Sequence, residues 1–351
     1  MKTHLVTGGS GYVGESIIQK LTELGDKIIS LDIIDTSNRI DGVEYILGSV
    51  LDKKLIDRIV SKVNFIHHNA ALVPLTKSGK LFREVNVEGT RNIMNSAMKH
   101  SVDHFCHMSS SAVFGLPVEL PLTNFSDRLP VEIYGQSKKD AEDLVITAMA
   151  TKSDFSASIV RPRTILGTKR LGIFELLFKW ISQGTDAFLI GEGSGLFQFA
   201  HIDDIVNSSI QSCLLKKKGI YNVGTLEFSS LERDLRALTK YANTGSRVRS
   251  LPEKITIKGL TVLDKLKLSP FAPWHYLTYH KPFYFDSSYV YDQLNFSPRG
   301  SNLECLKEAY DSYLNNKKEL ASSKNFGKSP HKSKLKAKLI DITARTFSIL
   351  P

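Results

Sequence analysis

A short apolar strand that runs directly into a glycine-rich turn and a helix constrains this chain more than any other feature. The strand HLVTG continues into TGGSGYVG, which places Gly8, Gly11 and Gly14 three residues apart at the start of a predicted helix. Glycines in such a turn let the backbone bend sharply and let the helix pack closely on the strand, while the helix N-terminus offers N–H groups to an anion. An ordinary tight turn is the alternative for the glycines alone.

The second predicted strand, KIISLD, ends in an acid. Asp32 lies 24 positions after Gly8, near the spacing at which a carboxylate accepts the ribose hydroxyls of NAD and repels the additional phosphate of NADP. A strand-end turn residue is the alternative for Asp32. Together, the glycines and this acid favour NAD as a bound cofactor.

Short β-rich runs alternate with longer runs of helical period through the first half of the chain. This rhythm is typical of a parallel sheet covered by helices. We predict an α/β fold: a doubly wound parallel (Rossmann) sheet over residues 1–165, to which later segments return, and a smaller C-terminal substrate lobe over residues 166–316 that closes over the sheet's carboxyl edge. Residues 317–351 form a basic tail. The region after Gly245 is rich in proline and aromatic residues, and one helix is predicted in it, near residues 302–314.

The formal net charge of +10 is unevenly distributed along the 351 residues. Nine basic residues and two acids give residues 317–351 a charge of +7, which leaves +3 for residues 1–316. A body so close to neutral argues against nucleic acid as a partner.

The cysteines and the hydropathy pattern indicate the compartment. Cys106, Cys213 and Cys305 are far apart and in no CxxC spacing, which argues against a disulfide framework and against a metal site. The sequence shows neither a signal peptide nor an apolar run of the ~18 residues that a membrane span needs. A cytoplasmic location is therefore expected.

The segment YGQSK places Tyr134 and Lys138 one helical turn apart, on the same face of a predicted helix. A phenol with a pKa near 10 is a poor base at pH 7, but an ammonium within ~4–6 Å lowers such a pKa by ~1–3 units. Tyr134 is therefore a candidate acceptor for the proton of an alcohol that is being oxidised. Taken alone, these two residues could also be an ordinary pair on the helix surface without a catalytic role. Upstream, MSSSAVFG supplies hydroxyls at the end of another predicted strand.

Taken in order, TGGSGYVG, Asp32, HHNAA, VNVEGT, SSSAVFG, YGQSK, RPRTILG and FAHIDDI resemble the extended short-chain dehydrogenase/reductase superfamily, and within it the NAD-dependent epimerase/dehydratase family. The similarity covers roughly residues 1–316, and it extends to the branch that contains 3β-hydroxysteroid dehydrogenases. The resemblance implies an NAD-dependent oxidoreductase or isomerase.

The resemblance also assigns roles to individual residues. Ser110, selected because it lies three residues before Val113, would hydrogen-bond the reacting oxygen; Tyr134 would be the acid/base; and Lys138 would also hold the nicotinamide ribose. The residues implied to contact NAD are Gly8, Gly11, Tyr12, Val13, Gly14, Asp32, Ile33, Ser49, Val50, Ala70, Ala71, Leu72, Tyr134, Lys138, Arg161, Pro162 and Ile165.

Other polar residues in the motifs are expected to support the fold. Asn86 would buttress the sheet, and His67 and His68 would be strand-end residues rather than ligands. His201 would stabilise the fold, with one of the two following acids, Asp203 or Asp204, capping the next helix.

Two departures from the family pattern bear on the substrate. Where nucleotide-sugar members commonly carry an arginine that clamps the diphosphate, this chain has Phe197, so either Lys169, Arg170 or Lys281 replaces it or the substrate is not a nucleotide. Where the 4,6-dehydratases carry Asp-Glu after the catalytic hydroxyl, this chain has Ser111-Ala112. A 4,6-dehydration is therefore disfavoured.

The sequence thus predicts oxidation and epimerisation at a secondary alcohol carbon, as in a nucleotide-sugar 4-epimerase. A net NAD-dependent dehydrogenase of an apolar alcohol, similar to 3β-hydroxysteroid dehydrogenases, is the first alternative, and a non-catalytic NAD-sensing protein is the second. The expected partners are a small-molecule substrate, either a nucleotide sugar or another secondary alcohol, and a second copy of the chain in a homodimer. No metal is expected.

The basic tail has an amphipathic pattern of its own. On a helix, Leu335, Leu339 and Ile342 form one apolar stripe and Ile340, Ala344 and Phe347 a neighbouring one, beside four lysines. Such a helix would either lie on an anionic membrane surface or dock on the body or a partner subunit.

Overall fold

The computed structural model describes residues 1–73, 79–168, 174–266 and 273–322. The chain forms two compact units. The first unit consists of Met1–Ile165, Ala200–Leu226 and Phe285–Arg299, and the second of Leu166–Phe199, Glu227–Tyr284 and Gly300–Pro351.

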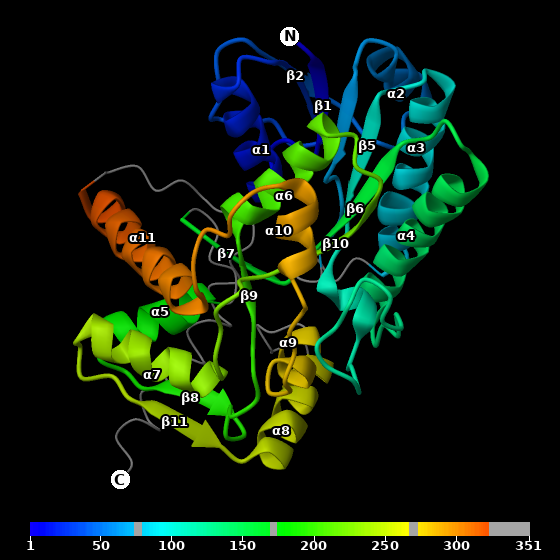
Figure 1. The fold of residues 1–351 in the computed structure, drawn as a ribbon. Helices are drawn as coiled ribbons and strands as arrows, with labels where there is room; N and C mark the ends of the chain where they lie inside the picture. The colour runs from blue at the N-terminus through cyan, green and yellow to red at the C-terminus, as the bar shows by residue number, and fades with distance from the viewer. Residues whose placement is uncertain (74–78, 169–173, 267–272, 323–351) are drawn as a thin grey trace. The chain divides into compact units, whose positions relative to one another are not determined.

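A parallel sheet of seven strands organises the first unit (Figure 1). Its spatial order is β10-β6-β5-β4-β1-β2-β3, so the chain winds outward in one direction from β1 and in the other from β4. The carboxyl ends of β1 and β4 therefore lie at the switch point where doubly wound folds bind ligands. The strands are β1 (Thr3–Thr7), β2 (Lys27–Asp32), β3 (Val43–Leu47), β4 (Phe65–His68), β5 (His104–Met108), β6 (Ala157–Pro162) and β10 (Gly219–Val223).

Helices cover both faces of this sheet, which confirms the predicted doubly wound fold. One face packs on α1 (Tyr12–Glu23), α6 (Ile202–Leu214) and α10 (Ser288–Leu294), and the other on α2 (Lys53–Val60), α3 (Gly89–Lys99) and α4 (Ile133–Thr151). Because successive side chains of a strand point to opposite faces, the neighbours Leu5 and Val6 are buried in the cores on the two sides of the sheet.

Two short helical segments adjoin these helices. One continuous helix contains a π-helical segment, η2 (Arg83–Glu88), and continues as α3. A 3₁₀ turn, η3 (Ser111–Phe114), follows β5.

The second unit is a helical layer around a short parallel pair of strands. It contains α5 (Phe174–Ser182), β8 (Ala187–Ile190), α7 (Leu231–Ala242), β11 (Val248–Leu251), α8 (Glu253–Lys265), α9 (Pro273–Thr278) and α11 (Asn302–Ser322). Its core combines aliphatic side chains with the aromatic residues Phe174, Phe178, Phe197, Phe199 and Tyr310. The short strands β7 (Thr164–Leu166) and β9 (Phe199–His201) lie where the chain passes from one unit to the other.

The structure corrects the prediction for the residues after Gly245. β11, α8, α9 and α10 were not predicted there, and α11 continues to Ser322 rather than ending near Leu314. The residues after Leu314 include lysine, glutamate, leucine and alanine, which favour helix continuation. The amphipathic helix predicted in the tail lies beyond Ser322, outside the described residues.

Two findings concern the environment of the chain. Within the described ranges, no helix is long and apolar enough to cross a membrane. Cys106, Cys213 and Cys305 are buried free thiols.

Candidate active site

The turn after β1 brings the N-terminus of α1 to the carboxyl edge of the sheet. Gly8 adopts a left-handed φ of 68°. A Cβ added to Gly14 would lie 2.1 Å from the carbonyl oxygen of Gly8, so the helix can pack this closely only with glycine there. The N-cap residue, Gly11, has no side chain with which to cap α1. The N–H groups of the first turn, at Tyr12 and Val13, therefore suit an anion such as a pyrophosphate.

Asp32 ends β2 next to this turn. One carboxylate oxygen accepts a hydrogen bond from the backbone N–H of Ser10 at 3.0 Å and the other from that of Ile34 at 2.9 Å. A carboxylate oxygen can accept more than one hydrogen bond, so Asp32 can hold the glycine turn and still accept from ribose hydroxyls. The neighbouring Ile33 is exposed.

Asp32 also lines a small hollow together with Tyr45 and Arg39. The Arg39 guanidinium bonds the carboxylate of Asp35 at 2.9 Å and lies over the Tyr45 ring, 5.2 Å from its centre. The hollow is thus lined by two acids and one cation: Asp32 stands at the end of β2, and Asp35 pairs with Arg39.

Ser49 and Val50 follow β3. Val50 is buried against α3, where a Cβ added to Gly89 would come within 2.6 Å of its methyl group. The Ser49 hydroxyl accepts a hydrogen bond from the N–H of Leu51 at 3.1 Å. Both residues therefore shape the turn after β3, and Ser49 is the more accessible of the two.

The segment Ala70–Leu72 follows β4 and is tied down at both ends. The N–H of Ala70 bonds the Thr7 hydroxyl at 3.2 Å. The Asn86 side chain accepts from the N–H of Leu72 at 2.8 Å, donates to its carbonyl at 3.2 Å, and donates to the Ser137 hydroxyl at 2.9 Å. Asn86 is buried and acts as the expected structural support, because it links this segment to the helix of Tyr134.

His67 and His68 are buried within β4. The two ring nitrogens of His68 bond the hydroxyls of Thr7 and Thr90, at 2.8 and 2.9 Å. Burial, with a contribution from the charge of Lys138, lowers the pKa of His68 to about 3. His67 bonds His4 and Ser209. Both histidines are strand residues held by polar neighbours, as predicted.

The three serines that follow β5 differ in how far they are exposed. Ser109 and Ser111 are buried, whereas Ser110 is half-buried. Ser110 is the N-cap of η3, and its hydroxyl oxygen accepts from the N–H of Ala112 at 3.2 Å. Its O–H can still donate to a reacting oxygen, which supports the choice of Ser110 over its neighbours.

Tyr134 and Lys138 occupy the first two turns of α4. The Glu132 carboxylate caps the helix by accepting from the N–H groups of Tyr134 and Gly135, at 2.9 and 2.7 Å. A Cβ added to Gly135 would lie 2.5 Å from the carbonyl oxygen of Ala112, so the start of α4 lies directly against η3. Tyr134 and the serine segment are thereby placed next to each other.

Lys138, one turn after Tyr134 on α4, is buried. Its ammonium donates a hydrogen bond of 2.6 Å to the backbone carbonyl of Met108, at the end of β5. Burial lowers the pKa of Lys138 to about 8, although the charge of Glu142 opposes this change. The amine is still mostly protonated at pH 7, so it supplies a fixed positive charge in a site largely shielded from water.

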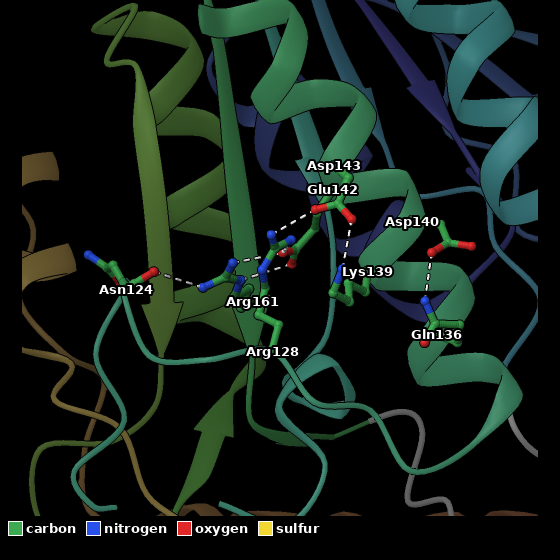
Figure 2. Close-up of polar contacts among 8 residues, drawn as sticks. All are labelled: Asn124, Arg128, Gln136, Lys139, Asp140, Glu142, Asp143 and Arg161. Carbon is green, nitrogen blue, oxygen red and sulfur yellow. Dashed lines mark hydrogen bonds and ion pairs between the residues drawn. The ribbon is translucent and has the colours of Figure 1, made fainter.

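Arg161 forms a buried ion-pair cluster with Glu142, one turn beyond Lys138 (Figure 2). The Arg161 guanidinium makes two bonds to the Glu142 carboxylate, at 2.9 and 2.7 Å, and a third of 3.2 Å to the carbonyl of Asn124. Arg128 bonds Glu142 at 3.0 Å and Asp143 at 2.7 Å. This cluster fastens α4 to β6 and to the loop that precedes α4.

The side chains of Arg161, Pro162 and Ile165 are used largely by the fold. The Arg161 guanidinium is buried and bound to Glu142, so a cofactor contact at this residue would be made by its backbone. Pro162 is buried at the end of β6, and Ile165 is half-buried against the core between the sheet and α6.

His201 differs in detail from its predicted role. The expectation that Asp203 or Asp204 caps α6 is wrong: His201 is itself the N-cap, and its Nδ1 accepts from the N–H of Asp203 at 3.2 Å. Asp204 is instead buried, where its carboxylate accepts from the N–H of Arg299 and the hydroxyl of Tyr291. Burial raises the pKa of Asp204 to about 6.

Phe197, which departs from the family pattern, and Lys281, one of the three cations considered in place of the arginine, lie in the second unit. Phe197 is buried, and its ring lies 5.2 Å from that of Phe199 and 5.4 Å from that of Tyr279. Lys281 bonds the Glu253 carboxylate at 2.8 Å. The other two candidate cations, Lys169 and Arg170, lie outside the described residues.

The first unit therefore fits NAD on its own evidence. An uncapped helix N-terminus follows a glycine turn, an acid closes the adjacent strand, and a buried lysine, one helical turn after a tyrosine, bonds the end of β5. The signals that sequence reasoning missed are the Glu132 cap and the Glu142 ion pairs, both of which hold α4 in place.

Comparison with curated proteins gives relatives of several kinds. The "Uncharacterized protein y4nG" of Sinorhizobium fredii is 34% identical over the whole of this chain and 88% of its own length. A "Putative UDP-glucose 4-epimerase" of Methanocaldococcus jannaschii is 27% identical over 63% of this chain and 76% of its own. The human "Sterol-4-alpha-carboxylate 3-dehydrogenase, decarboxylating" is 25% identical over 58% of this chain and 56% of its own.

Solved structures show the same fold, and the match to a family model shows the family. The crystal structure of a UDP-glucose 4-epimerase with UDP-glucose from Thermotoga maritima matches with a TM-score of 0.74 at 18% identity, over 90% of this chain and 99% of that one. The model of the NAD dependent epimerase/dehydratase family matches residues 4–224. The chain therefore belongs to the NAD dependent epimerase/dehydratase family and is an NAD-dependent enzyme of that family.

Proposed function

We propose that this enzyme is a nucleotide-sugar 4-epimerase, which oxidises a secondary alcohol carbon and reduces it again from the other face. The observation that supports the proposal is that the first turn of α4, which carries Tyr134, lies directly against the segment that carries the half-buried Ser110, one turn before the buried Lys138. The relative from Methanocaldococcus jannaschii, named as a putative UDP-glucose 4-epimerase, supports the substrate class.

The residues divide the work of proton transfer. The Tyr134 phenolate takes the proton of the substrate hydroxyl, and the Lys138 ammonium stabilises that phenolate before the transfer. The Ser110 hydroxyl donates a hydrogen bond to the oxygen as it becomes a carbonyl. Bound NAD would supply the hydride acceptor and donor for the carbinol carbon. Tyr134 then gives its proton back to the oxygen, so the cycle is balanced with no net redox change.

The experiment is an isotope test with UDP-glucose deuterated at C4 and the purified enzyme with NAD. An epimerase produces UDP-galactose that retains the deuterium, and no NADH accumulates in solution. NADH formed in proportion to a keto product would contradict epimerisation. UDP-N-acetylglucosamine and UDP-glucuronic acid, deuterated in the same way, extend the test to other sugars of this class.

The second candidate is a net dehydrogenase of an apolar alcohol. It is favoured by Phe197, which is buried against two aromatic rings and so supplies no cation for a diphosphate. The human sterol dehydrogenase among the relatives points the same way. A 3β-hydroxysterol deuterated at C3 distinguishes this candidate, because the label would then pass to free NADH.

A further inference from the structure

The helix α8 of the second unit (Figure 1) carries exposed aliphatic side chains along one side. In this helix, which is described in full, no residue is buried. Ile255 is 74% exposed, Val262 52%, and Leu266, which caps the helix, 62%. Their spacing of seven and then four residues places them on one side of the helix. Gly259 and Leu263 lie on the same side and are also exposed.

The opposite side of α8 attaches the helix to its unit. Thr256, Ile257, Leu260 and Thr261 are half-buried, and α8 contacts β8 and α9. The exposure of the stripe therefore comes from the orientation of a packed helix.

Three lysines border the apolar stripe. Lys254, Lys258 and Lys265 are exposed and fall next to one another on the helical wheel, along one edge of the stripe. The two acids of the fully described helix, Glu253 and Asp264, lie on the attached half, where Glu253 bonds Lys281. The exposed half of α8 is thus aliphatic and positively charged.

We propose that α8 binds an anionic lipid surface, with the helix in the plane of the interface. An aliphatic stripe beside lysines is the pattern of interfacial helices, in which the apolar side chains enter the acyl boundary and the lysines reach the headgroup phosphates. The charge argues against two other occupants. A second copy of α8 would bring the same three lysines, and the tail of this chain, residues 317–351, is itself basic at +7.

The test is cosedimentation of the full chain with phosphatidylcholine vesicles that either contain or lack phosphatidylserine. The probe variants are the double variant Ile255→Glu with Val262→Glu and the double variant Lys254→Gln with Lys258→Gln. Val118→Glu is the matched control, because Val118 is a 97% exposed apolar residue of the first unit. Every variant keeps the tail unchanged, so a difference among them reports on α8.

The proposal predicts binding that requires phosphatidylserine and weakens with salt. Each lysine removed should lower the partition coefficient about fivefold, the glutamate variant should lower it at least about tenfold, and the Val118 variant should bind like the parent. Thermal unfolding of all variants checks that they are folded. Equal binding by the α8 variants, or no binding by the parent, overturns the proposal. A parent dimer that the α8 glutamates dissociate also overturns it, in favour of a protein contact.

Discussion

The first two turns of α4 and its middle each bury a charged residue, but the two charges have different partners. Glu142, in the middle, accepts bonds from the guanidinium groups of Arg161 and Arg128. Lys138, one turn earlier, donates to the neutral carbonyl of Met108. A buried charge with oppositely charged partners holds elements together. A buried charge whose partner is neutral is not compensated, so it acts more strongly on the pKa of neighbouring groups.

The burial of the Lys138 charge lowers the stability of the folded chain by an amount that depends on pH. Burial lowers the pKa of Lys138 to about 8 in the folded chain, below the value near 10.4 of an unfolded lysine. Below pH 8 both states are protonated, so the cost of burying the charge is fully present. Between about pH 8 and pH 10.4 the folded state has lost the proton that the unfolded state still binds, so stability from this group rises with pH.

The largest effect is expected from removing the proton carrier. Tyr134→Phe should lower kcat by about 10²–10⁴-fold, because only the transferable proton is lost. NAD affinity and thermal unfolding should stay close to those of the parent. Steady-state kinetics and NAD titration check both points, and a variant that kept most of its turnover would refute the role given to Tyr134.

The middle of α4 should respond through stability instead. Glu142→Gln leaves two guanidinium groups, one of them buried, without their shared carboxylate and should lower the free energy of unfolding by about 3–5 kcal/mol. Asp140→Asn is the control on the same helix, because Asp140 pairs at the surface with Arg83 and should cost less than about 1 kcal/mol. Denaturant unfolding of both variants measures the difference. Similar costs for the two would mean that the buried cluster does not fasten α4.

The serine segment tests the geometry around Tyr134. Ser110→Ala should lower kcat by about 10²-fold, since it removes a donor to the developing oxyanion. Ser109→Ala and Ser111→Ala, at buried positions, should affect turnover less. Kinetics of the three single variants rank them, and a larger loss with Ser111→Ala would show that the catalytic hydroxyl is one residue further along.

The smallest effect concerns the choice of cofactor. NAD should bind at least about tenfold more tightly than NADP, because the Asp32 carboxylate would face the additional phosphate. Asp32→Asn should narrow that ratio. Fluorescence titration with both cofactors measures it. Equal or tighter NADP binding would instead point to Arg39, which lines the same hollow.

The sheet of the first unit was predictable because its signals are local. Each parallel strand is a short apolar run next to a helix of clear period, and the first two strands end in the glycine turn and in Asp32. The elements after Gly245 were not predictable in this way. α8 packs only half-buried residues, so its pattern lacks the buried stripe on which a prediction depends, and the proline-rich composition around it suggested loops.

The candidate site shows the same limit. Tyr134, Lys138 and the glycine turn could be found from spacing along the chain. The contacts that position them could not, because they join residues far apart in the sequence: Asn86 bonds Ser137, and Glu142 bonds Arg161 from the next strand. His201 shows a further reason. The capping role of a histidine depends on the orientation of its ring, and the sequence does not give that orientation.

The contrast within α4 is tested most directly by the unfolding free energy of Lys138→Met, measured beside its activity at pH 7 and at pH 9.5. Turnover and NAD affinity should fall, while the free energy of unfolding at pH 7 should be unchanged or higher by up to ~3 kcal/mol, because a buried charge has been removed. This gain should shrink at pH 9.5, where the folded parent has already lost that charge. A loss of several kcal/mol at pH 7, like that expected for Glu142→Gln, would contradict the account and make Lys138 a structural residue.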